Sequence, residues 1–414
     1  MNRTVRCCIA GGGPAGMMLG LLLARAGVDV LVLEKHADFL RDFRGDTVHP
    51  STLQVMHELG LLDAFLARPH DAVRELTASV GGEQVVLADF GRLNIRCPFI
   101  VLMPQWEFLD FLRDAALQYP GFGLLMQAEC TGLIEQDGLV RGVRGHTPDG
   151  PFEIRANLVI GADGRRSVVR SAAGLPVRDI GAPIDVLWMR LPRHSGDLDT
   201  TGGRINPGHF LAMLNRGSYW QCAFVIPKGG IDALKAQGLA AFREALTHAA
   251  PLFADRVHLL QSWDDIKLLS VAVDRLARWW RPGLLCIGDA AHAMSPIGGV
   301  GINLAIQDAV ATANLLAEPL ANSVLTSTDL SAWLPRVQKR RTFPTRVTQR
   351  MQVVVQNNLL VPVLASGPGA QPFHGLPWPM RLLRRWPVLR AVPAWLVGVG
   401  VRPEHVRSHR AVSR

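Results

Sequence analysis

Small and acidic residues gather in the sequence 283–309, GLLCIGDAAHAMSPIGGVGINLAIQDA, in a pattern that could hold a ligand. The apolar residues at 284–287 predict a buried strand, and Gly288-Asp289 follows directly after it. Glycines at 298, 299 and 301 leave the next turn almost without side chains. Such a turn lets the backbone approach a bound molecule closely, although an ordinary glycine-rich loop has the same pattern.

A second glycine-rich turn lies near the N-terminus. Gly11, Gly13 and Gly16 form G-x-G-x-x-G between a predicted strand (5–10) and a predicted helix (14–26), and a second buried strand (29–34) ends in Glu34. The glycines permit a tight turn, close approach of a pyrophosphate and close helix–strand packing, while Glu34 can accept hydrogen bonds from ribose hydroxyls. This context predicts dinucleotide binding. Because the turn interrupts the apolar run at 7–24, we do not interpret that run as a signal peptide or membrane span.

A third motif lies in NLVIGADGRRSVVR, residues 157–170, where a buried strand ends in Gly161-Ala162-Asp163-Gly164. With the other two motifs, in this order, the chain resembles the para-hydroxybenzoate hydroxylase-like family of single-component (class A) FAD-dependent monooxygenases over roughly residues 4–330. The resemblance implies FAD as the cofactor and NAD(P)H as a transient reductant, with the choice between NADH and NADPH open. It implies no metal site.

The resemblance also implies which residues meet the cofactor. Asp289 would bond the ribityl chain, Asp163-Gly164 would handle FAD and NAD(P)H, and Gln105 would touch the cofactor from a helix start. Arg44, in a looser match, would lie near the flavin, and the nearby Ser51 and Gln54 also match a helix-capping pattern. The full set of expected cofactor contacts is Gly11, Gly13, Pro14, Ala15, Gly16, Glu34, Lys35, Arg44, Gln105, Asp163, Gly164, Asp289, Pro296, Gly299, Gly301, Ile302 and Asn303.

The implied chemistry belongs mainly to the flavin. NAD(P)H would reduce FAD, O2 would add to give a C4a-hydroperoxide, and its distal oxygen would pass to a hydrophobic, aromatic or polyketide/quinone-like small molecule. Pro296 would line the face where oxygen and substrate meet, and a helix from about 301 to 317 would aim its N-terminus at the reduced flavin. His49, His209 and Tyr219 are candidate proton-handling residues, against the alternative that each is structural. His292 is expected to shape the cofactor loop.

The expected fold class is α/β. It combines a Rossmann-like FAD-binding domain of the GR2 type with an α+β substrate domain on a mostly antiparallel sheet. Strands are expected at 185–193, 209–215 and 219–227, bounded by Gly and Pro. Trp188, Met213, Trp220, Gln221 and Phe224 could face the pocket or belong to the core. The FAD-binding domain would comprise 1–75, 102–175 and 271–330, the substrate domain 76–101 and 176–270, and a helical segment 331–414.

Charge separates the last segment from the rest of the chain. Residues 331–414 hold 14 Lys and Arg and one acidic residue, Glu404, within a chain of net charge +9. Trp333, Trp378, Trp386 and Trp395 are interspersed among them. This composition fits either helices packed on the body or a peripheral contact with an anionic membrane, and no motif for nucleic-acid binding accompanies it. Six cysteines without paired spacing fit a reducing cytoplasm.

Three other functions remain open from the sequence. A flavin-dependent halogenase would carry W-x-W-x-I-P, whereas residues 222–227 read CAFVIP and match only the Ile-Pro. A flavin-dependent reductase of isoprenoid double bonds would share the three motifs. A flavin-binding sensor without turnover would share them too. The leading interpretation is the monooxygenase, with O2 and a small-molecule substrate as its partners.

Overall fold

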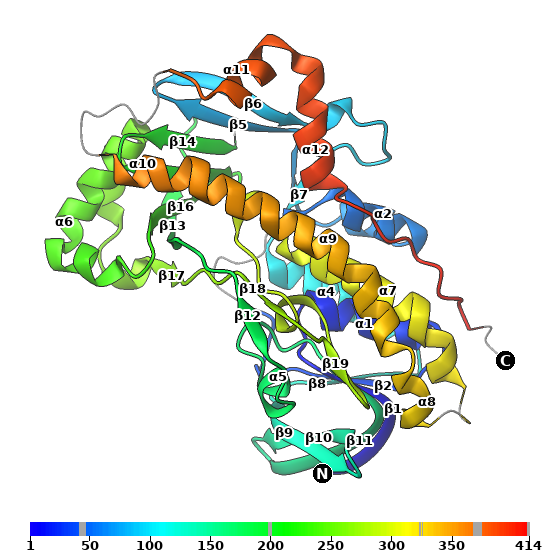
Figure 1. Cartoon of the computed structure of the whole chain (residues 1–414). Helices are drawn as coiled ribbons and strands as arrows, with labels where there is room; N and C mark the ends of the chain where they lie inside the picture. The colour runs from blue at the N-terminus through cyan, green and yellow to red at the C-terminus, as the bar shows by residue number, and fades with distance from the viewer. Residues whose placement is uncertain (41–46, 198–200, 323, 325, 367–374, 412–414) are drawn as a thin grey trace.

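The computed structural model describes residues 1–40, 47–197, 201–322, 324, 326–366 and 375–411. Figure 1 shows two β-sheets toward opposite ends of the molecule, with the long helices α7 (Gly301–Ala321) and α9 (Leu334–Val355) running between them. The expected combination of a Rossmann-like domain, a mostly antiparallel second sheet and a helical C-terminal segment is confirmed.

The first sheet has eight strands, with β19-β20-β11-β1-β2-β8 as its central order and β10 and β9 attached through β11. The strands β20, β11, β1, β2 and β8 run parallel to one another. Their apolar runs are buried on both faces, as expected for parallel strands covered by helices. The bounds are β1 Asn2–Ala10, β2 Val30–Leu33, β8 Phe122–Leu125, β9 Glu129–Gln136, β10 Leu139–Thr147, β11 Gly150–Gly161, β19 Trp280–Arg281 and β20 Leu284–Cys286.

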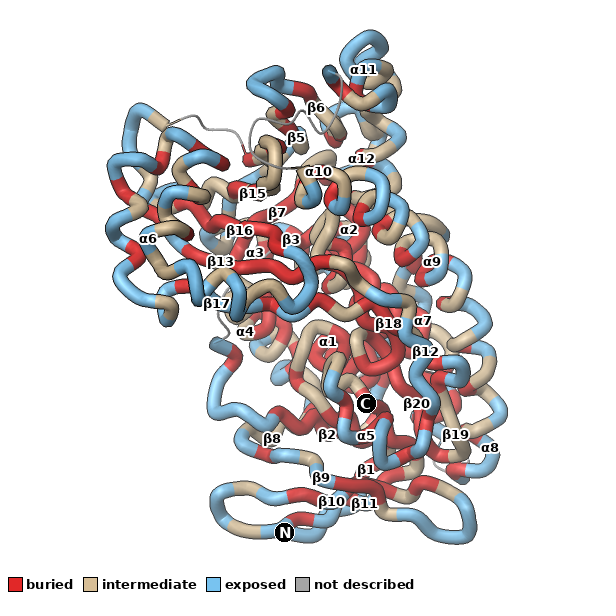
Figure 2. Tube along the Cα trace, turned by 60° about the vertical axis from the view of Figure 1, so that its left-hand side comes forward, coloured by how far each residue is buried: buried red, intermediate tan, exposed pale blue. Residues whose placement is uncertain are grey.

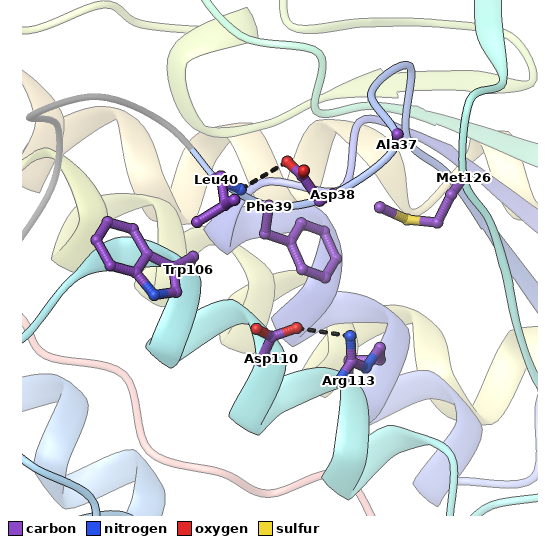
Figure 3. Close-up of a pocket in the computed structure, with 8 residues that line it drawn as sticks. All are labelled: Ala37, Asp38, Phe39, Leu40, Trp106, Asp110, Arg113 and Met126. Carbon is purple, nitrogen blue, oxygen red and sulfur yellow. Dashed lines mark hydrogen bonds and ion pairs between the residues drawn. The ribbon is translucent and has the colours of Figure 1, made fainter.

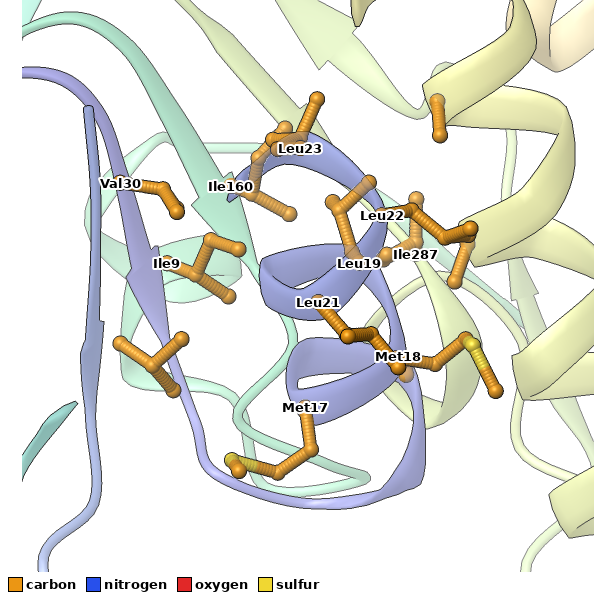
Figure 4. Packing of buried hydrophobic residues seen from close by; sticks show 14 of the residues in the cluster. Ile9, Met17, Met18, Leu19, Leu21, Leu22, Leu23, Val30, Ile160 and Ile287 are labelled. Carbon is orange, nitrogen blue, oxygen red and sulfur yellow. The ribbon is translucent and has the colours of Figure 1, made fainter. Parts of the chain in front are cut away.

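Helix α1 (Pro14–Arg25) forms the core of this domain together with the sheet. It is apolar on nearly all sides because it lies between the sheet and α7, and Figure 4 shows its side chains against Ile9, Ile160 and Ile287. The apolar run at 7–24 therefore belongs to a folded core. Among the described residues, only the stretch Ile297–Ala321, which includes α7, is long and apolar enough to cross a membrane, and it is mostly buried inside the protein.

The second sheet has seven strands in the order β17-β13-β16-β15-β14-β5-β6, and all its pairs are antiparallel except β14 with β5. The early hairpin β5–β6 thus joins strands from the middle of the chain, although the exact domain bounds stay a prediction. The bounds are β5 Glu75–Val80, β6 Glu83–Asp89, β13 Ile184–Pro192, β14 Gly202–Asn206, β15 His209–Asn215, β16 Tyr219–Pro227 and β17 Lys267–Leu269.

Two small sheets and nine further α-helices complete the described structure. The sheets are β3 (Thr47–Val48), β7 (Ile100–Leu102) and β4 (Asp71–Val73), and the pair β12 (Val177–Asp179) and β18 (Asp274–Leu276). The remaining α-helices are α2 Pro50–Glu58, α3 Leu62–Leu66, α4 Gln105–Ala116, α5 Val168–Ala172, α6 Ile231–Ala249, α8 Ser327–Ser331, α10 Val361–Ala365, α11 Trp378–Arg385 and α12 Ala391–Gly398. Figure 2 shows buried residues concentrated in the central strands and exposed ones in the outer turns.

One local expectation is wrong. Ser51 does not cap a helix, because α2 begins at Pro50 and its N-cap is His49, which places Ser51 inside the first turn. Gln54 donates to Glu58 one turn further on, at 2.9 Å. A proline at the first helical position has displaced the start that the S-x-x-Q pattern suggested.

Candidate active site

The three motifs found in the sequence meet at one edge of the eight-stranded sheet. Parallel strands present their carboxyl ends at the same edge, and this is where ligands of such folds bind. The backbone N–H of Gly11 donates to Leu33 O at 2.8 Å, that of Ala162 donates to Ala10 O at 2.8 Å, and that of Ile287 donates to Gly161 O at 2.9 Å. The turns after β1, β2, β11 and β20 are therefore neighbours.

The glycines of the first motif have different surroundings. A Cβ on Gly11, at φ +111°, would lie 2.3 Å from Ala162 O, and one on Gly16 would lie 1.9 Å from Gly11 O. A Cβ on Gly13 would meet no atom within 4 Å. Gly11 and Gly16 thus allow the backbone to pack, whereas Gly13 opens onto free space at the N-terminus of α1. These residues fit a dinucleotide pyrophosphate, whose charge the helix N-terminus would stabilise.

The acidic residue after β2 is held in place. Glu34 is buried, and its carboxylate accepts from the N–H of Gly12 and the N–H of His36, both at 3.0 Å. A hollow of about 350 Å³ lies between residues 37–40 and α4. Figure 3 shows Trp106, Asp110 and Arg113 projecting toward it from α4. The hollow is lined by residues that closely follow Glu34 in the sequence.

The two later acidic residues differ in what they bond. Asp163 accepts from Ser167 Oγ at 2.5 Å and from Val169 N at 3.1 Å, so its carboxylate closes the turn into α5. Its pKa is raised mainly by burial. Asp289 is more open, and its carboxylate lies 3.4 Å from a guanidinium nitrogen of Arg165. Of the two, Asp289 is the carboxylate with room for a hydroxyl-bearing ligand, while Asp163 shapes the turn.

The segment 288–303, here called the 288–303 loop, includes the start of α7. Gly298 and Gly299 have φ of +77° and +62°, and a Cβ on Gly299 would lie 2.5 Å from Thr47 Oγ1. Asn303 Oδ1 accepts from His49 N at 2.9 Å and from Thr52 Oγ1 at 2.7 Å. The side chain of Asn303, an expected cofactor contact, therefore fastens residues 47–52 to the loop.

His49 lies beside the 288–303 loop, fully buried. Burial lowers the pKa of His49 to about 4, although its hydrogen bond to Val397 O acts in the opposite direction. Its Nδ1 lies 2.8 Å from that oxygen, while Nε2 has no hydrogen-bond partner among the described residues. The neutral imidazole that results has the location expected of a site residue, and a catalytic role for it stays a prediction.

The other two candidate proton-handling residues lie on opposite faces of the seven-stranded sheet. Even-numbered residues of β16 pack with α6, and His209 is on that side, with its ring 5.7 Å from Phe224. Odd-numbered residues of β16 lie on the side where Ile297 packs, and alternation places Tyr219 there, at the end of the strand. The structure thus brings Tyr219 to the face of the 288–303 loop and turns His209 away from it.

The same alternation assigns the other residues considered for the pocket to one face or the other of the seven-stranded sheet. Met213, Trp220 and Phe224 are core residues packed against α6. Trp188 packs on the loop face, and Gln221 follows the strand parity of that face. Trp188 Nε1 and Gln221 Oε1 are buried without a hydrogen-bond partner among the described residues.

The other expected cofactor contacts lie at the starts of helices, in turns or on the surface. Pro14 and Ala15 start α1, Gln105 starts α4, and Gly301 and Ile302 start α7. Pro296 precedes the turn at Ile297–Gly299, Gly164 has φ +82° with open space around it, and Lys35 is exposed. Arg44 lies outside the described residues.

Sequence reasoning missed the residues that hold the 288–303 loop from behind. They are Asp308 on α7 and Arg341, Gln349, Gln352 and Gln356 at the back of the site, all buried. In the sequence these residues appear only as polar residues at helical spacing, and that pattern is typical of a helix face exposed to solvent.

Known proteins resemble this chain in sequence and in fold. Residues 4–347 match the family model described as "FAD binding domain". The chain is 36% identical to "6-methylpretetramide 4-monooxygenase" of Streptomyces rimosus, over 85% of this chain and 84% of the relative. It is 27% identical to "Probable NADH-specific resorcinol 4-hydroxylase" of Rhodococcus jostii, over 75% of this chain but 55% of the relative. The solved OxyS anhydrotetracycline hydroxylase from Streptomyces rimosus has a TM-score of 0.74 at 23% identity, covering 96% and 77% of the two chains, and supports the fold.

Proposed function

This chain belongs to the FAD binding domain family and is an FAD-dependent monooxygenase, and we propose that it inserts one oxygen atom from O2 into an aromatic, polyketide- or quinone-like small molecule, with NAD(P)H as reductant. The observation that carries this proposal is the meeting of three motifs at one sheet edge, opposite a second sheet whose inner face packs on Ile297. The relative that acts on 6-methylpretetramide supports a polycyclic aromatic substrate class.

FAD, when bound, would carry electrons from NAD(P)H to O2 and supply the oxygen-transfer chemistry. The protein's own residues bind and orient it. Gly13 and the N-terminus of α1 would meet the pyrophosphate, Glu34 the ribose, and Asp289 the ribityl hydroxyls. The N-terminus of α7 at Gly301 would stabilise negative charge that develops on the reduced ring.

The substrate would lie between the 288–303 loop and the inner face of the seven-stranded sheet. Two buried polar atoms there, the Nε1–H donor of Trp188 and the Oε1 acceptor of Gln221, lack a partner among the described residues. Buried polar groups usually find partners, so such a pair fits a ligand that carries both a carbonyl and a hydroxyl group. Phenolic ketones of the polyketide type have both.

The experiment that tests the proposal is turnover under ¹⁸O2 with each reduced nicotinamide, using polycyclic phenols and simple phenols as substrates. One ¹⁸O atom in the product, with NAD(P)H consumed in equal amount, is the expected result. Full reduction of flavin with a saturated product and no ¹⁸O would instead indicate a reductase. A brominated or chlorinated product with halide present would indicate a halogenase. Tight FAD binding without turnover of any phenol would favour a sensor.

A second candidate property concerns the C-terminal segment. Trp378, Trp386 and Trp395 are 70%, 54% and 41% exposed, and Val388 and Val392 are exposed with them. Val392 and Trp395 also line an apolar hollow of about 320 Å³ with Leu93. Arg381, Arg384 and Arg385 belong to the same segment, which has no acidic residue between 375 and 403. We propose that these helices touch an anionic membrane surface from the cytoplasmic side, because Trp favours the interface and Arg attracts anionic lipids.

Sedimentation of the holoenzyme with vesicles tests this property. We expect the protein to bind vesicles of phosphatidylcholine with phosphatidylglycerol. Salt should weaken this binding, and so should the triple variant Trp378→Ser, Trp386→Ser and Trp395→Ser. Equal binding to vesicles of pure phosphatidylcholine, or unchanged binding by the triple variant, would contradict the membrane proposal. A concentration-dependent dimer lost in that variant would assign the surface to a second copy of the chain.

A further inference from the structure

Helix α9 presents one continuous buried polar face to the back of the site. The face is formed by residues at steps of three or four positions, which places them on one side of the helix: Arg341, Thr345, Gln349, Gln352 and Gln356, the residue directly after α9. All of them are essentially inaccessible to solvent. A face so polar and so deeply buried requires hydrogen-bond partners, because unpaired polar groups are costly inside a protein.

Four of the hydrogen bonds made by this face go to the 288–303 loop. Gln352 Nε2 donates to Ser295 O at 2.8 Å and to Ile297 O at 2.9 Å. Gln356 Nε2 donates to Ser295 Oγ at 2.9 Å, and Gln349 Nε2 donates to Ala293 O at 3.0 Å. The two carbonyls bound by Gln352 flank Pro296, the residue expected to line the pocket.

The other end of the loop is held through Asp308. Arg341 Nε donates to Asp308 Oδ1 at 2.8 Å. The other carboxylate oxygen, Oδ2, accepts from the N–H of Gly288 at 3.0 Å and lies 2.6 Å from His292 Nε2. The connection continues outward, because Glu404, near the end of the described residues, lies 3.6 Å from Arg341 Nη1 and accepts from Arg340 Nε at 2.7 Å.

We propose that α9 is the positioning element of the FAD site, with Gln352 setting the backbone around Pro296 and Arg341, through Asp308, setting the turn at Gly288. This inference rests on the proposed placement of FAD at the 288–303 loop. It makes the first part of the basic C-terminal segment a component of the cofactor site and separates it from the exposed helices α11 and α12. None of these side chains is proposed to touch the substrate.

The chain offers a matched control on the same helix. Gln338 Nε2 donates to Ala277 O at 3.0 Å, and Gln338 Oε1 accepts from Trp279 N at 3.1 Å, so Gln338 also makes two bonds to backbone. Those bonds fasten a segment that precedes β20 and lies outside the loop. Gln352→Leu and Gln338→Leu therefore remove equal numbers of hydrogen bonds from one helix, and only the first removes bonds to the loop itself.

The experiment measures the Kd of the apoprotein for FAD by flavin fluorescence, and the visible circular dichroism of the bound flavin. We expect Gln352→Leu to raise Kd about tenfold and to change the flavin spectrum, with Gln338→Leu within about twofold of the wild type and spectrally unchanged. Equal Kd values and spectra in both variants would overturn the inference. If Gln352→Leu does not fold, Gln356→Leu, which loses one bond to Ser295, takes its place in the comparison with the same two outcomes.

Failure of the inference can be told from failure of the proposed function. A wild-type protein that binds FAD and forms oxygenated product, together with variants that bind FAD equally well, would remove only the role of α9. A wild-type protein that binds no FAD would remove both.

Discussion

His292 Nε2 lies 2.6 Å from Asp308 Oδ2, at a place where neither side chain reaches solvent. Since the same carboxylate also receives Arg341 at 2.8 Å and the N–H of Gly288 at 3.0 Å, one buried charge joins α7, α9 and the Gly288-Asp289 turn. A buried carboxylate is tolerated only when it is fully paired, so these four groups must be assembled together. The turn that carries Asp289 is thereby fixed by residues far from it in the sequence.

Replacing Asp308 by Asn should destabilise the protein by about 3–5 kcal/mol, because Arg341 would then be buried without its closest carboxylate. Burial alone would raise the pKa of Asp308, but His292 and Arg341 lower it below the ordinary value of 3.8. The folded state therefore holds the proton less tightly than the unfolded state, and stability is lost as the pH falls below about 4. Thermal unfolding of Asp308→Asn should show a lower Tm at neutral pH and a smaller decrease of Tm as the pH falls below 4. The same decrease of Tm in acid as in the wild type would contradict the role given to the Asp308 carboxylate.

His49 should also make folding acid-sensitive, at higher pH. Its pKa falls from 6.5 to about 4 on burial, so the unfolded chain binds its proton between these values and the folded chain does not. Stability is therefore complete above about pH 6.5 and decreases by about 3 kcal/mol as the pH falls to 4. His49→Gln should remove this decrease in denaturant unfolding measured from pH 7 to 4. A His49 NMR titration with a midpoint near 6.5 in the folded protein would show the prediction to be wrong.

Gly13 and Gly16 should respond differently to alanine. A methyl group at residue 16 would meet the backbone oxygen of Gly11 at 1.9 Å, so Gly16→Ala should lower the free energy of unfolding by about 1–3 kcal/mol or more. At residue 13 the methyl group would enter open space, so Gly13→Ala should fold normally. That space is where we place the pyrophosphate, and the Kd for FAD should rise about tenfold, as measured by fluorescence titration. Equal FAD binding by Gly13→Ala and wild type would refute this placement.

Gln221 and Trp188 should affect substrate use more than stability. Gln221→Leu and Trp188→Phe remove buried polar atoms that we assign to the substrate, and kcat/KM should fall about 10- to 100-fold, consistent with the loss of one buried hydrogen bond. Met213→Leu, on the α6 face of the same sheet, should leave kcat/KM unchanged. Steady-state oxygen or NAD(P)H consumption, with product quantified, gives the comparison. An equal loss of kcat/KM in all three variants would mean that the substitutions act through the packing of the sheet and not through substrate recognition.

Much of the fold could be predicted from the sequence because its signals are local. Gly11, Gly13 and Gly16 sit between a strand and a helix, and the apolar runs that end in Glu34 and Gly161 mark strands of a parallel sheet. These turns meet because parallel strands bring their ends to one edge. The start of α2 was predicted wrongly because Pro50 overrides the capping pattern of Ser51.

The missing parts of the site depend on contacts that are distant in sequence. Whether His209 or Tyr219 faces the 288–303 loop follows from strand register, and a shift of one residue would exchange the two faces. The glutamines of α9 look like a solvated helix face in the sequence, and only their packing against Ser295 and Ile297 shows otherwise. No local sequence motif marks Asp308 as a site residue, because its sequence pattern indicates only that it lies on a helix.

The most direct test of the account is rapid mixing of the reduced, FAD-loaded protein with ¹⁸O2 in the presence of a polycyclic phenol. We expect a transient absorbance distinct from both oxidised and reduced flavin, followed by product that carries one ¹⁸O atom. Direct return to oxidised flavin, with all the oxygen recovered as hydrogen peroxide for every phenol tested, would contradict it.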